Sequence, residues 1–281
     1  MSNRVLEKFN LRRDPFSVDI AAEGLYRFAS FKQGLGRLEQ AVLQRSSMLI
    51  IGEPGSGKTA LVRSAASRLA SSNYLLLEQL VPCAQKPIRA VVEGLLDTLG
   101  EPLPFNNPPR ALLKVKRGLL DSSEKQRTPV LVLDDVHHLT QSCWLVLKSL
   151  INYEMDSRAP IVLLLLGNPS ALRALNFSAL DEVRDRLSLC FHLKGLQGDE
   201  VGAYLKQRLT WAGTDRPIFP ADVVTAIAQH TQGLPRRVNR LANAGLLAAA
   251  SKDRDLVDHE CLQIALSELQ FQAPQREESI R

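Results

Sequence analysis

The sequence has no hydrophobic run long enough to cross a membrane. Its longest apolar stretch, residues 161–166, is far shorter than the roughly 20 residues that a spanning helix needs. The N-terminal segment MSNRVLEKFNLRRDPF carries charges where a signal peptide requires an apolar core. We therefore expect a cytoplasmic protein with no membrane partner.

Cysteine and aromatic residues are also few. The four cysteines, Cys83, Cys143, Cys190 and Cys261, have no paired spacing, which fits neither a disulfide framework nor a zinc site, so we expect buried, reduced thiols. Aromatic residues make up 5% of the chain, and no stacking, zinc or helix-turn-helix pattern indicates base-specific reading of nucleic acid. The net charge of +5 is compatible with an acidic partner but is also common in proteins that bind none.

Apolar runs alternate with helical segments over the first two thirds of the chain. The runs lie at residues 47–51, 74–80, 130–133, 161–166 and 189–193. Because they are continuously apolar, they predict an α/β domain with a mostly parallel sheet that helices cover on both faces. The helices between the strands are expected at residues 60–71, 87–99, 109–121 and 141–154.

After Gly195 no strand-like run remains. Helical patterns at residues 199–212, 220–230, 235–251 and 259–270 predict a small all-helical domain. The chain is therefore expected to hold a core with an N-terminal extension at residues 1–195, a helical domain at 196–270 and a polar tail at 271–281.

The segment GEPGSGKT at residues 52–59 is a P-loop pattern that directly follows one predicted strand and precedes a predicted helix. Its glycines allow a tight turn that points backbone N–H groups at phosphate oxygens, and the helix N-terminus adds a favourable partial charge. Lys58 is expected to reach the β and γ phosphates of ATP, and Thr59 to offer its hydroxyl to Mg²⁺. The predicted nucleotide-binding residues are Gly52, Glu53, Pro54, Gly55, Ser56, Gly57, Lys58, Thr59 and Ala60.

A second motif, VLVLDDVHHL at residues 130–139, ends a predicted strand with two acidic residues. Asp134 is the candidate Mg²⁺ ligand of a Walker B motif. Asp135 holds the position where many ATPases carry a glutamate base for the attacking water, and the alternative is that it only caps the strand end. Its side chain is about one methylene shorter than glutamate, which predicts slow hydrolysis, because a misplacement near 1 Å can cost on the order of 100-fold in rate. Adjacent side chains at a strand end diverge, so His137 and His138 are interpreted as structural or partner-facing groups.

Four polar residues further along the chain are candidate catalytic groups. Asn168 follows the fourth apolar run and either orients the attacking water or serves as a turn former before proline. Arg184 and Arg186 precede the final strand. In a head-to-tail assembly one of them can act as an arginine finger in the neighbour's site, and otherwise both are solvated charges. Arg236 follows a Gly-x-Pro turn at a helix start, where it suits phosphate contact when the helical domain closes.

These motifs together resemble the AAA+ superfamily over roughly residues 40–270: Walker A, Walker B, an Asn sensor, a finger arginine and a second-sensor arginine in a helical lid. The segments at residues 9–26 (FNLRRDPFSVDIAAEGLY) and 233–250 (GLPRRVNRLANAGLLAAA) are similar to one branch, which includes the secretion ATPase ExeA and the transposition regulators of the TnsC and TniB type. The resemblance implies the sheet order 5-1-4-3-2, ATP between core and lid, and a ring or helical filament as the active form. Asp135 departs from the Asp-Glu pair of this branch and resembles the Asp-Asp of some signal-transduction ATPases.

The resemblance also suggests a role. ExeA-like proteins usually continue into a membrane segment and a wall-binding domain, whereas this sequence ends after its lid pattern. That favours a regulator of DNA transposition that oligomerises on duplex DNA without sequence preference and recruits or activates a transposase or integrase-like recombinase. A scaffold or switch of a secretion or signalling complex, without DNA binding, is the alternative.

A basic segment at residues 110–127 is the candidate DNA-facing surface. Six basic residues against two acidic ones give it +4 of the chain's +5, and Lys86 and Arg89 lie nearby in sequence. Such a cluster can neutralise phosphates without reading bases, or it can be an ordinary solvated helix face. The charged residues are Arg110, Lys114, Lys116, Arg117, Lys125 and Arg127, with Asp121 and Glu124.

Overall fold

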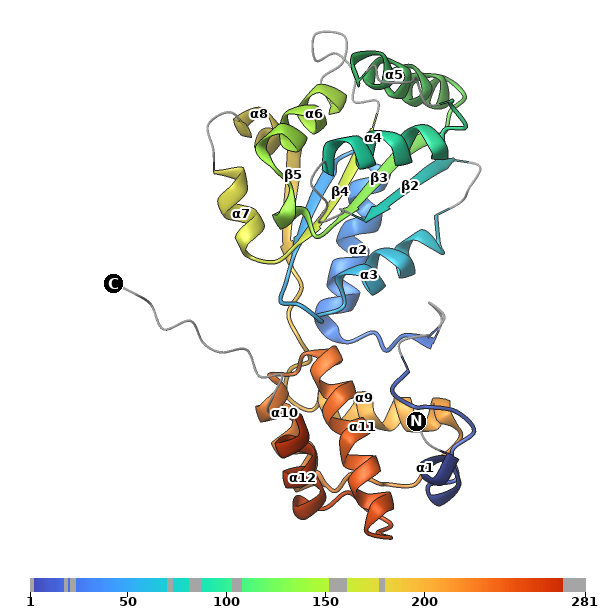
Figure 1. Ribbon diagram of the computed structural model, residues 1–281, viewed down its shortest axis with the longest axis vertical. Coiled ribbons are helices and arrows are strands. Elements are labelled where there is room, and N and C mark those ends of the chain that lie inside the picture. Colours follow the sequence, from blue (N-terminus) through green and yellow to red (C-terminus); the bar gives the residue numbers. More distant parts are fainter. Residues whose placement is uncertain are drawn as a thin grey trace, which may run out of the picture. The chain divides into compact units, whose positions relative to one another are not determined.

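The computed structural model describes residues 3–17, 20, 24–69, 73–80, 87–102, 108–151, 161–176 and 180–269. The chain divides into two compact units, labelled by their elements in Figure 1. One unit is the continuous segment Phe31–Lys194, which contains a sheet. The other is helical and combines Met1–Ser30 with Gly195–Arg281.

A five-stranded parallel sheet forms the centre of the first unit. Its strands lie in the order β2-β3-β4-β1-β5, which confirms the predicted order. They are β1 (Ser47–Ile51), β2 (Tyr74–Leu80), β3 (Thr128–Asp134), β4 (Val162–Gly167) and β5 (Leu187–His192). Because β1, β4 and β3 are neighbours in register, their carboxyl ends meet at one edge of the sheet, where Ile51 pairs with Gly167.

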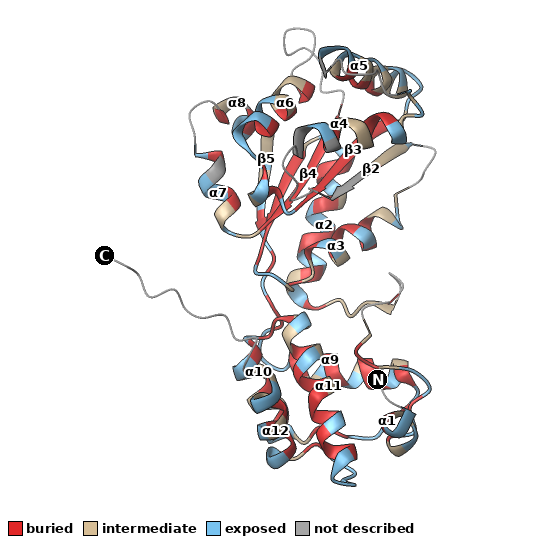
Figure 2. Ribbon diagram, in the orientation of Figure 1, coloured by how far each residue is buried: buried red, intermediate tan, exposed pale blue. Residues whose placement is uncertain are grey.

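Burial explains why these segments are strands. Every residue of β1, β3 and β4 is buried, as the continuous apolar runs predicted, and Figure 2 shows these central strands in red. The edge strand β5 instead alternates between covered and exposed positions. The helices of this unit are α2 (Ala29–Leu43), α3 (Lys58–Ala66), α4 (Pro87–Thr98), α5 (Pro108–Glu124), α6 (Gln141–Ile151), α7 (Ser170–Leu175) and α8 (Asp181–Arg186), with a 3-10 turn η2 (Val136–His138).

Helices pack on the sheet through apolar side chains one or two turns apart. On one face, Leu49, Leu131 and Leu163 belong to a single buried cluster with residues of α4, α5 and α6. Elsewhere in the unit, α2 approaches β5 so closely that a Cβ on Gly34 would lie 2.7 Å from the ring of Phe191. Helix α2 was not predicted, whereas the other helices of eight or more residues begin and end within a few residues of their predicted limits.

The helical unit contains α1 (Asn3–Lys8), α9 (Glu200–Ala212), α10 (Ala221–Thr231), α11 (Pro235–Ser251) and α12 (His259–Leu269). We expected the N-terminal extension to belong to the core, but Met1–Ser30 is part of this unit instead. The buried guanidinium of Arg208 donates from Nε to the Pro15 carbonyl at 2.5 Å and from Nη2 to the Ser17 carbonyl at 2.7 Å. The backbone N–H of Arg12 donates to the carbonyl of Ala212 at 2.8 Å. These long-range contacts leave no local pattern in the sequence, which explains the wrong assignment.

Three further expectations concern cysteines, the tail and the membrane. Cys143 and Cys261 are buried thiols as predicted, but Cys190 is exposed because it lies on the edge strand β5. Cys83 and the polar tail lie outside the described residues. Within the ranges described above, no helix combines the length and apolar character needed to span a membrane.

Candidate nucleotide site

The P-loop connects β1 to α3 at the carboxyl edge of the sheet. Gly55 and Gly57 have φ angles of 86° and 102°, a left-handed conformation that favours glycine. Gly52 is required for space, because a Cβ there would lie 2.7 Å from both the Leu193 carbonyl oxygen and the Ser56 hydroxyl. The Gly52 N–H donates to the Gly167 carbonyl at 3.1 Å, which ties the loop to the end of β4.

Polar groups inside the loop fit a phosphate. Lys58 is only 8% exposed, and its Nζ donates to the carbonyls of Gly52 at 2.9 Å and Glu53 at 3.3 Å, so the ammonium lies over the loop. Ser56 is fully buried, yet its hydroxyl has no hydrogen-bond partner among the described residues. A buried cation and an unsatisfied hydroxyl beside a helix N-terminus are the groups that a phosphate oxygen satisfies. The remaining predicted residues fall in the same segment, with Glu53 and Pro54 exposed and Ala60 in the first turn of α3.

The Mg²⁺ ligands predicted from two distant motifs lie together. The Thr59 hydroxyl donates to Asp134 Oδ2 at 2.5 Å, and Asp134 Oδ1 accepts the Asp135 backbone N–H at 2.8 Å. Asp134 is 8% exposed. A hydroxyl and a carboxylate in contact are the oxygen ligands that Mg²⁺ prefers, so these two side chains would hold it. Among the described residues, no group of three or more His, Cys, Asp and Glu side chains is arranged to hold a metal ion.

Asp135 begins the turn that follows β3. It has a left-handed backbone with φ of 51°, and its side chain is 58% exposed. The next turn, η2, places the His137 and His138 rings 4.1 Å apart, so the expectation that these side chains diverge is wrong. Burial lowers the pKa of His137, with further lowering by His138 and Lys58, and these outweigh the opposite effect of the Asp135 and Asp134 carboxylates, which favours the neutral imidazole.

Asn168 follows β4 directly and lies beside the P-loop strand in the sheet. Its side-chain oxygen accepts hydrogen bonds from the Ser170 N–H at 2.9 Å and the Ser170 hydroxyl at 2.5 Å. The oxygen therefore orders the start of α7. Its side-chain amide is the group that can turn toward a water at the carboxyl edge.

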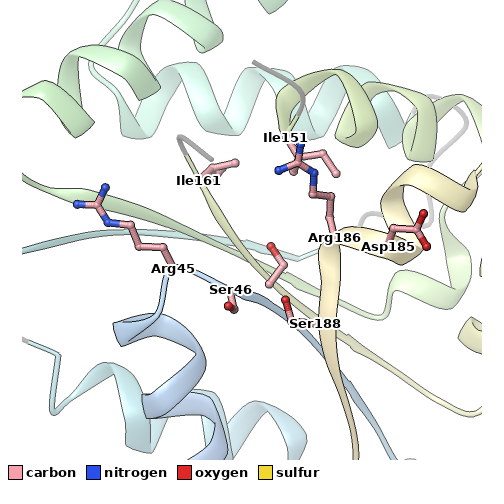
Figure 3. Close-up of a pocket in the computed structure, with 8 residues that line it drawn as sticks. Arg45, Ser46, Ile151, Ile161, Asp185, Arg186 and Ser188 are labelled. Carbon is pink, nitrogen blue, oxygen red and sulfur yellow. The ribbon is translucent and has the colours of Figure 1, made fainter. Parts of the chain in front are cut away.

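Arg184 and Arg186 lie at the opposite end of the strands, at the amino edge of the sheet. They end α8 immediately before β5, and Leu187 at the start of β5 pairs with Ser47 at the start of β1. The P-loop follows the other end of β1, so neither arginine belongs to the same edge as the phosphate site. Arg184 pairs with Asp181 at 2.7 Å, whereas Arg186 lines a hollow of about 150 Å³ with Arg45, Ser46, Ser47, Ile151, Ile161, Asp185 and Ser188 (Figure 3).

Arg236 belongs to the helical unit. It follows Pro235, the first residue of α11, and its side chain is exposed. The predicted helix start is therefore correct, and the role at the phosphates stays a prediction.

The basic segment forms α5, whose buried residues Ala111, Val115 and Leu119 face the sheet unit's core. Not all of its charge is available to a partner. Lys114 donates to the Pro102 carbonyl at 3.0 Å and lies 3.5 Å from Glu101, and Arg127 donates to the Tyr74 carbonyl at 3.4 Å. The exposed basic residues are Arg110, Arg117 and Lys125, and Lys116 is half-buried. Lys86 lies outside the described residues, and Arg89 on α4 pairs with Glu93 at 2.5 Å.

Comparisons with known proteins agree with this geometry. Residues 42–175 match the family model described as AAA domain. The chain is 25% identical over 266 residues to General secretion pathway protein A of Aeromonas hydrophila, a match that covers 93% of this chain and 48% of that protein. It therefore spans about half the length of this curated relative.

Solved structures share the fold. The Aeropyrum pernix ORC1 protein in complex with DNA superposes with a TM-score of 0.69 at 18% identity, covering 92% of this chain and 70% of that one. Cdc6p from Pyrobaculum aerophilum superposes with a TM-score of 0.70 at 18% identity, covering 90% and 70%.

The sheet order, the phosphate loop and the matched domain define a nucleotide-hydrolysing P-loop ATPase. Within that class, the chain has the AAA+ fold, and residues 42–175 are similar to the AAA domain family.

Proposed function

We propose that this ATPase is an ATP-dependent regulator of DNA transposition, which oligomerises on duplex DNA and recruits or activates a transposase. One observation supports the oligomer above all others. Arg184 and Arg186 lie at the sheet edge opposite the P-loop, so one chain does not bring them to its own phosphates. A second copy that docks its α8 edge against the P-loop edge of the first would supply the arginine that stabilises charge on the transferred phosphoryl group.

The residues at the carboxyl edge then divide the work within one chain. Lys58 and the loop N–H groups bind the phosphates, and Thr59 with Asp134 holds Mg²⁺, which supplies charge neutralisation when bound. Asp135 is the proposed base for water, and Asn168 orients that water. The short, exposed Asp135 side chain favours slow turnover, so that bound ATP acts mainly as a signal for assembly.

DNA as the partner is supported by charge. Arg110 and Arg117 lie two turns apart on one exposed face of α5, and the acidic Asp121 follows one turn later. Positive charge on this face is thus concentrated in the first two thirds of the helix, where it suits backbone phosphates. The fold is shared with a protein solved in complex with DNA.

DNA retention tests this proposal directly. Protein with Mg²⁺ and a non-hydrolysable ATP analogue should remain on random-sequence duplex DNA and dissociate as salt rises, with affinity falling steeply on a logarithmic scale. Lys58→Ala, which removes the phosphate-binding ammonium, should not be retained. Equal retention of both proteins without nucleotide and at high salt would contradict the proposal.

A scaffold or switch in a secretion complex is the second candidate, because the match to General secretion pathway protein A covers 93% of this chain. The two candidates differ in their partners. Affinity capture from the native host with the ATP analogue should recover a transposase or integrase-like recombinase under the first proposal. Recovery of membrane-assembly proteins, with no nucleotide-dependent DNA retention, would favour the second.

A further inference from the structure

His137 is a partly buried group beside the nucleotide site to which no role has been assigned. Its Nδ1 is buried and makes no hydrogen bond among the described residues, and its side chain is only 15% exposed. Leaving a buried donor unpaired costs about 1–3 kcal/mol. Native proteins therefore pair such groups in at least one functional state.

The Asp135 carboxylate is an acceptor close to this nitrogen. His137 Nδ1 lies 4.0 Å from Asp135 Oδ1, about 1 Å beyond hydrogen-bond length. The two side chains differ in freedom, since the imidazole is packed and the carboxylate is 58% exposed. Rotation of the short Asp135 side chain is thus the movement that closes the gap.

The backbone around the pair is fixed. The His138 N–H donates to the Asp135 carbonyl at 3.0 Å, which closes the η2 turn. This turn also abuts the end of β4, because a Cβ on Gly167 would lie 3.2 Å from Val136 Cγ2. His137 is therefore held at the carboxyl edge, next to the strand that leads to Asn168.

We propose that His137 is a positioning residue for Asp135. In the nucleotide-bound protein, its Nδ1–H donates to the Asp135 carboxylate and holds this short side chain toward the attacking water. The hydrogen bond restrains the short carboxylate in the direction of the water. A longer, better-packed glutamate would not need this restraint. This inference rests on the proposed role of Asp135 as the base.

Side-chain replacements separate this role from simple packing. His137→Ala should lower kcat by about 10-fold while KM for ATP and the affinity for an ATP analogue change less than about twofold, because only the base is misplaced. His137→Asn, whose amide nitrogen lies near the position of Nδ1, should recover most of the rate. His137→Gln, whose amide lies near Nε2, should not. The exposed neighbour is the matched control, and His138→Ala should keep the wild-type kcat.

If His137 acts through Asp135, its replacement should have little effect once Asp135 is removed. The double variant Asp135→Ala/His137→Ala should hydrolyse ATP within about twofold of Asp135→Ala alone. Multiplicative losses, an unchanged kcat in His137→Ala, or equal rates for the Asn and Gln variants would each overturn the inference. Matching thermal unfolding curves must accompany the kinetics, and the Asn–Gln comparison remains decisive if the alanine variant unfolds.

A spectroscopic readout does not depend on turnover. In protein with ¹⁵N-labelled histidine, Mg²⁺ and a non-hydrolysable ATP analogue, the His137 Nδ1–H signal should be protected from exchange and lost in Asp135→Ala. A His137 Nδ1–H signal that exchanges with solvent and does not change in Asp135→Ala would overturn the inference. Absence of hydrolysis in an otherwise ATP-binding wild type would instead count against the proposed ATPase cycle.

Discussion

Asp135 links the chemistry of single residues to the expected behaviour of this ATPase. It directly follows Asp134, the proposed Mg²⁺ ligand, and its carboxylate is one methylene shorter than the glutamate common at this position. Its left-handed backbone, with φ of 51°, sets the direction of the side chain. Reach and direction together limit how well it can contact a water at the phosphate.

The first prediction tests that limit. Asp135→Glu should retain or raise ATP hydrolysis, by up to about 10-fold, because the longer side chain extends the carboxylate toward the water. Steady-state phosphate release measures the effect, with Lys58→Ala as the control that no longer binds ATP. Unchanged turnover in Asp135→Ala would remove this residue from the mechanism.

A second residue, Arg208, matters for stability rather than chemistry. It is 3% exposed, donates to two carbonyls of the N-terminal segment, and lies with its guanidinium 5.5 Å from the Trp211 ring centroid. Burial lowers its pKa from the ordinary value, although its hydrogen bonds are those of the charged form.

Arg208→Ala should lower the free energy of unfolding of the helical unit by about 3 kcal/mol, because a buried and a partly buried carbonyl lose a charged donor. Urea denaturation followed by tryptophan fluorescence measures the change. Lys206→Ala, on the exposed side of the same helix, should change it by less than about 0.5 kcal/mol. Equal effects of the two substitutions would show that the Arg208 hydrogen bonds do not contribute to the stability of the helical unit.

At the scale of elements, the pattern of apolar residues predicted much of this structure. The strands β1, β3 and β4 were found because each is buried on both faces, and α9 to α12 because Gly213, Pro220 and Pro235 mark their limits. Helix α2 was missed although Phe31, Leu35, Leu38 and Val42 recur at helical spacing and are all buried. The helical spacing of these apolar residues is therefore sufficient to predict α2 from the sequence.

The site was predictable to the extent that its motifs are local. The P-loop and Asp134 were identified from strand–loop–helix spacing, and their contact through Thr59 at 2.5 Å follows from the sheet order. The position of His137 was not predictable, because it depends on the 3-10 turn after β3 and on packing against Gly167. The packing of the N-terminal segment likewise depends on Arg208, some 190 residues away in sequence.

The turn before α11 allows a sharp test at this scale. Gly233 has φ of 65°, and a Cβ there would lie 2.0 Å from the Leu196 carbonyl oxygen. Gly198 has a similar φ of 52° but nothing within 4 Å of such a Cβ. The two glycines thus share a left-handed backbone that strains other residues, and they differ in the space that is open to a Cβ.

Gly233→Ala should cost more than about 3 kcal/mol of stability, whereas Gly198→Ala should cost only about 1 kcal/mol, since backbone strain alone applies there. Thermal unfolding of the two variants side by side measures the difference. Similar melting temperatures would mean that the turn relaxes and that the close approach has little energetic weight.

At the scale of the whole molecule, the proposed assembly would complete the site. If Arg186 acts on a neighbour, a protein with a defective P-loop can still supply the arginine. Arg186→Ala and Lys58→Ala should each lose most ATPase activity alone. Mixed in equal amounts, they should regain about one quarter of the wild-type rate, the fraction of interfaces that combine an intact loop with an intact arginine.

Arg184→Ala is the matched control for that mixture. Arg184 lies on the same helix and pairs with Asp181, and if Arg186 is the residue that acts on the neighbour, the loss of Arg184 should reduce activity much less. No recovery in the mixture would assign Arg186 to a role within its own chain. Equal losses for the two single variants would leave Arg186 without a distinct function.

The helical unit is built from both ends of the chain, with the whole of Phe31–Lys194 inserted between its two parts. During synthesis, the binding surface for residues 3–17 does not exist until α9 has left the ribosome. At about 5–20 residues per second, the N-terminal segment waits roughly 10–40 s for its partner helix. The order of translation therefore gives the sheet unit time to fold first. In the interval, apolar side chains of the N-terminal segment such as Val5, Phe9 and Phe16 stay exposed as a target for chaperones.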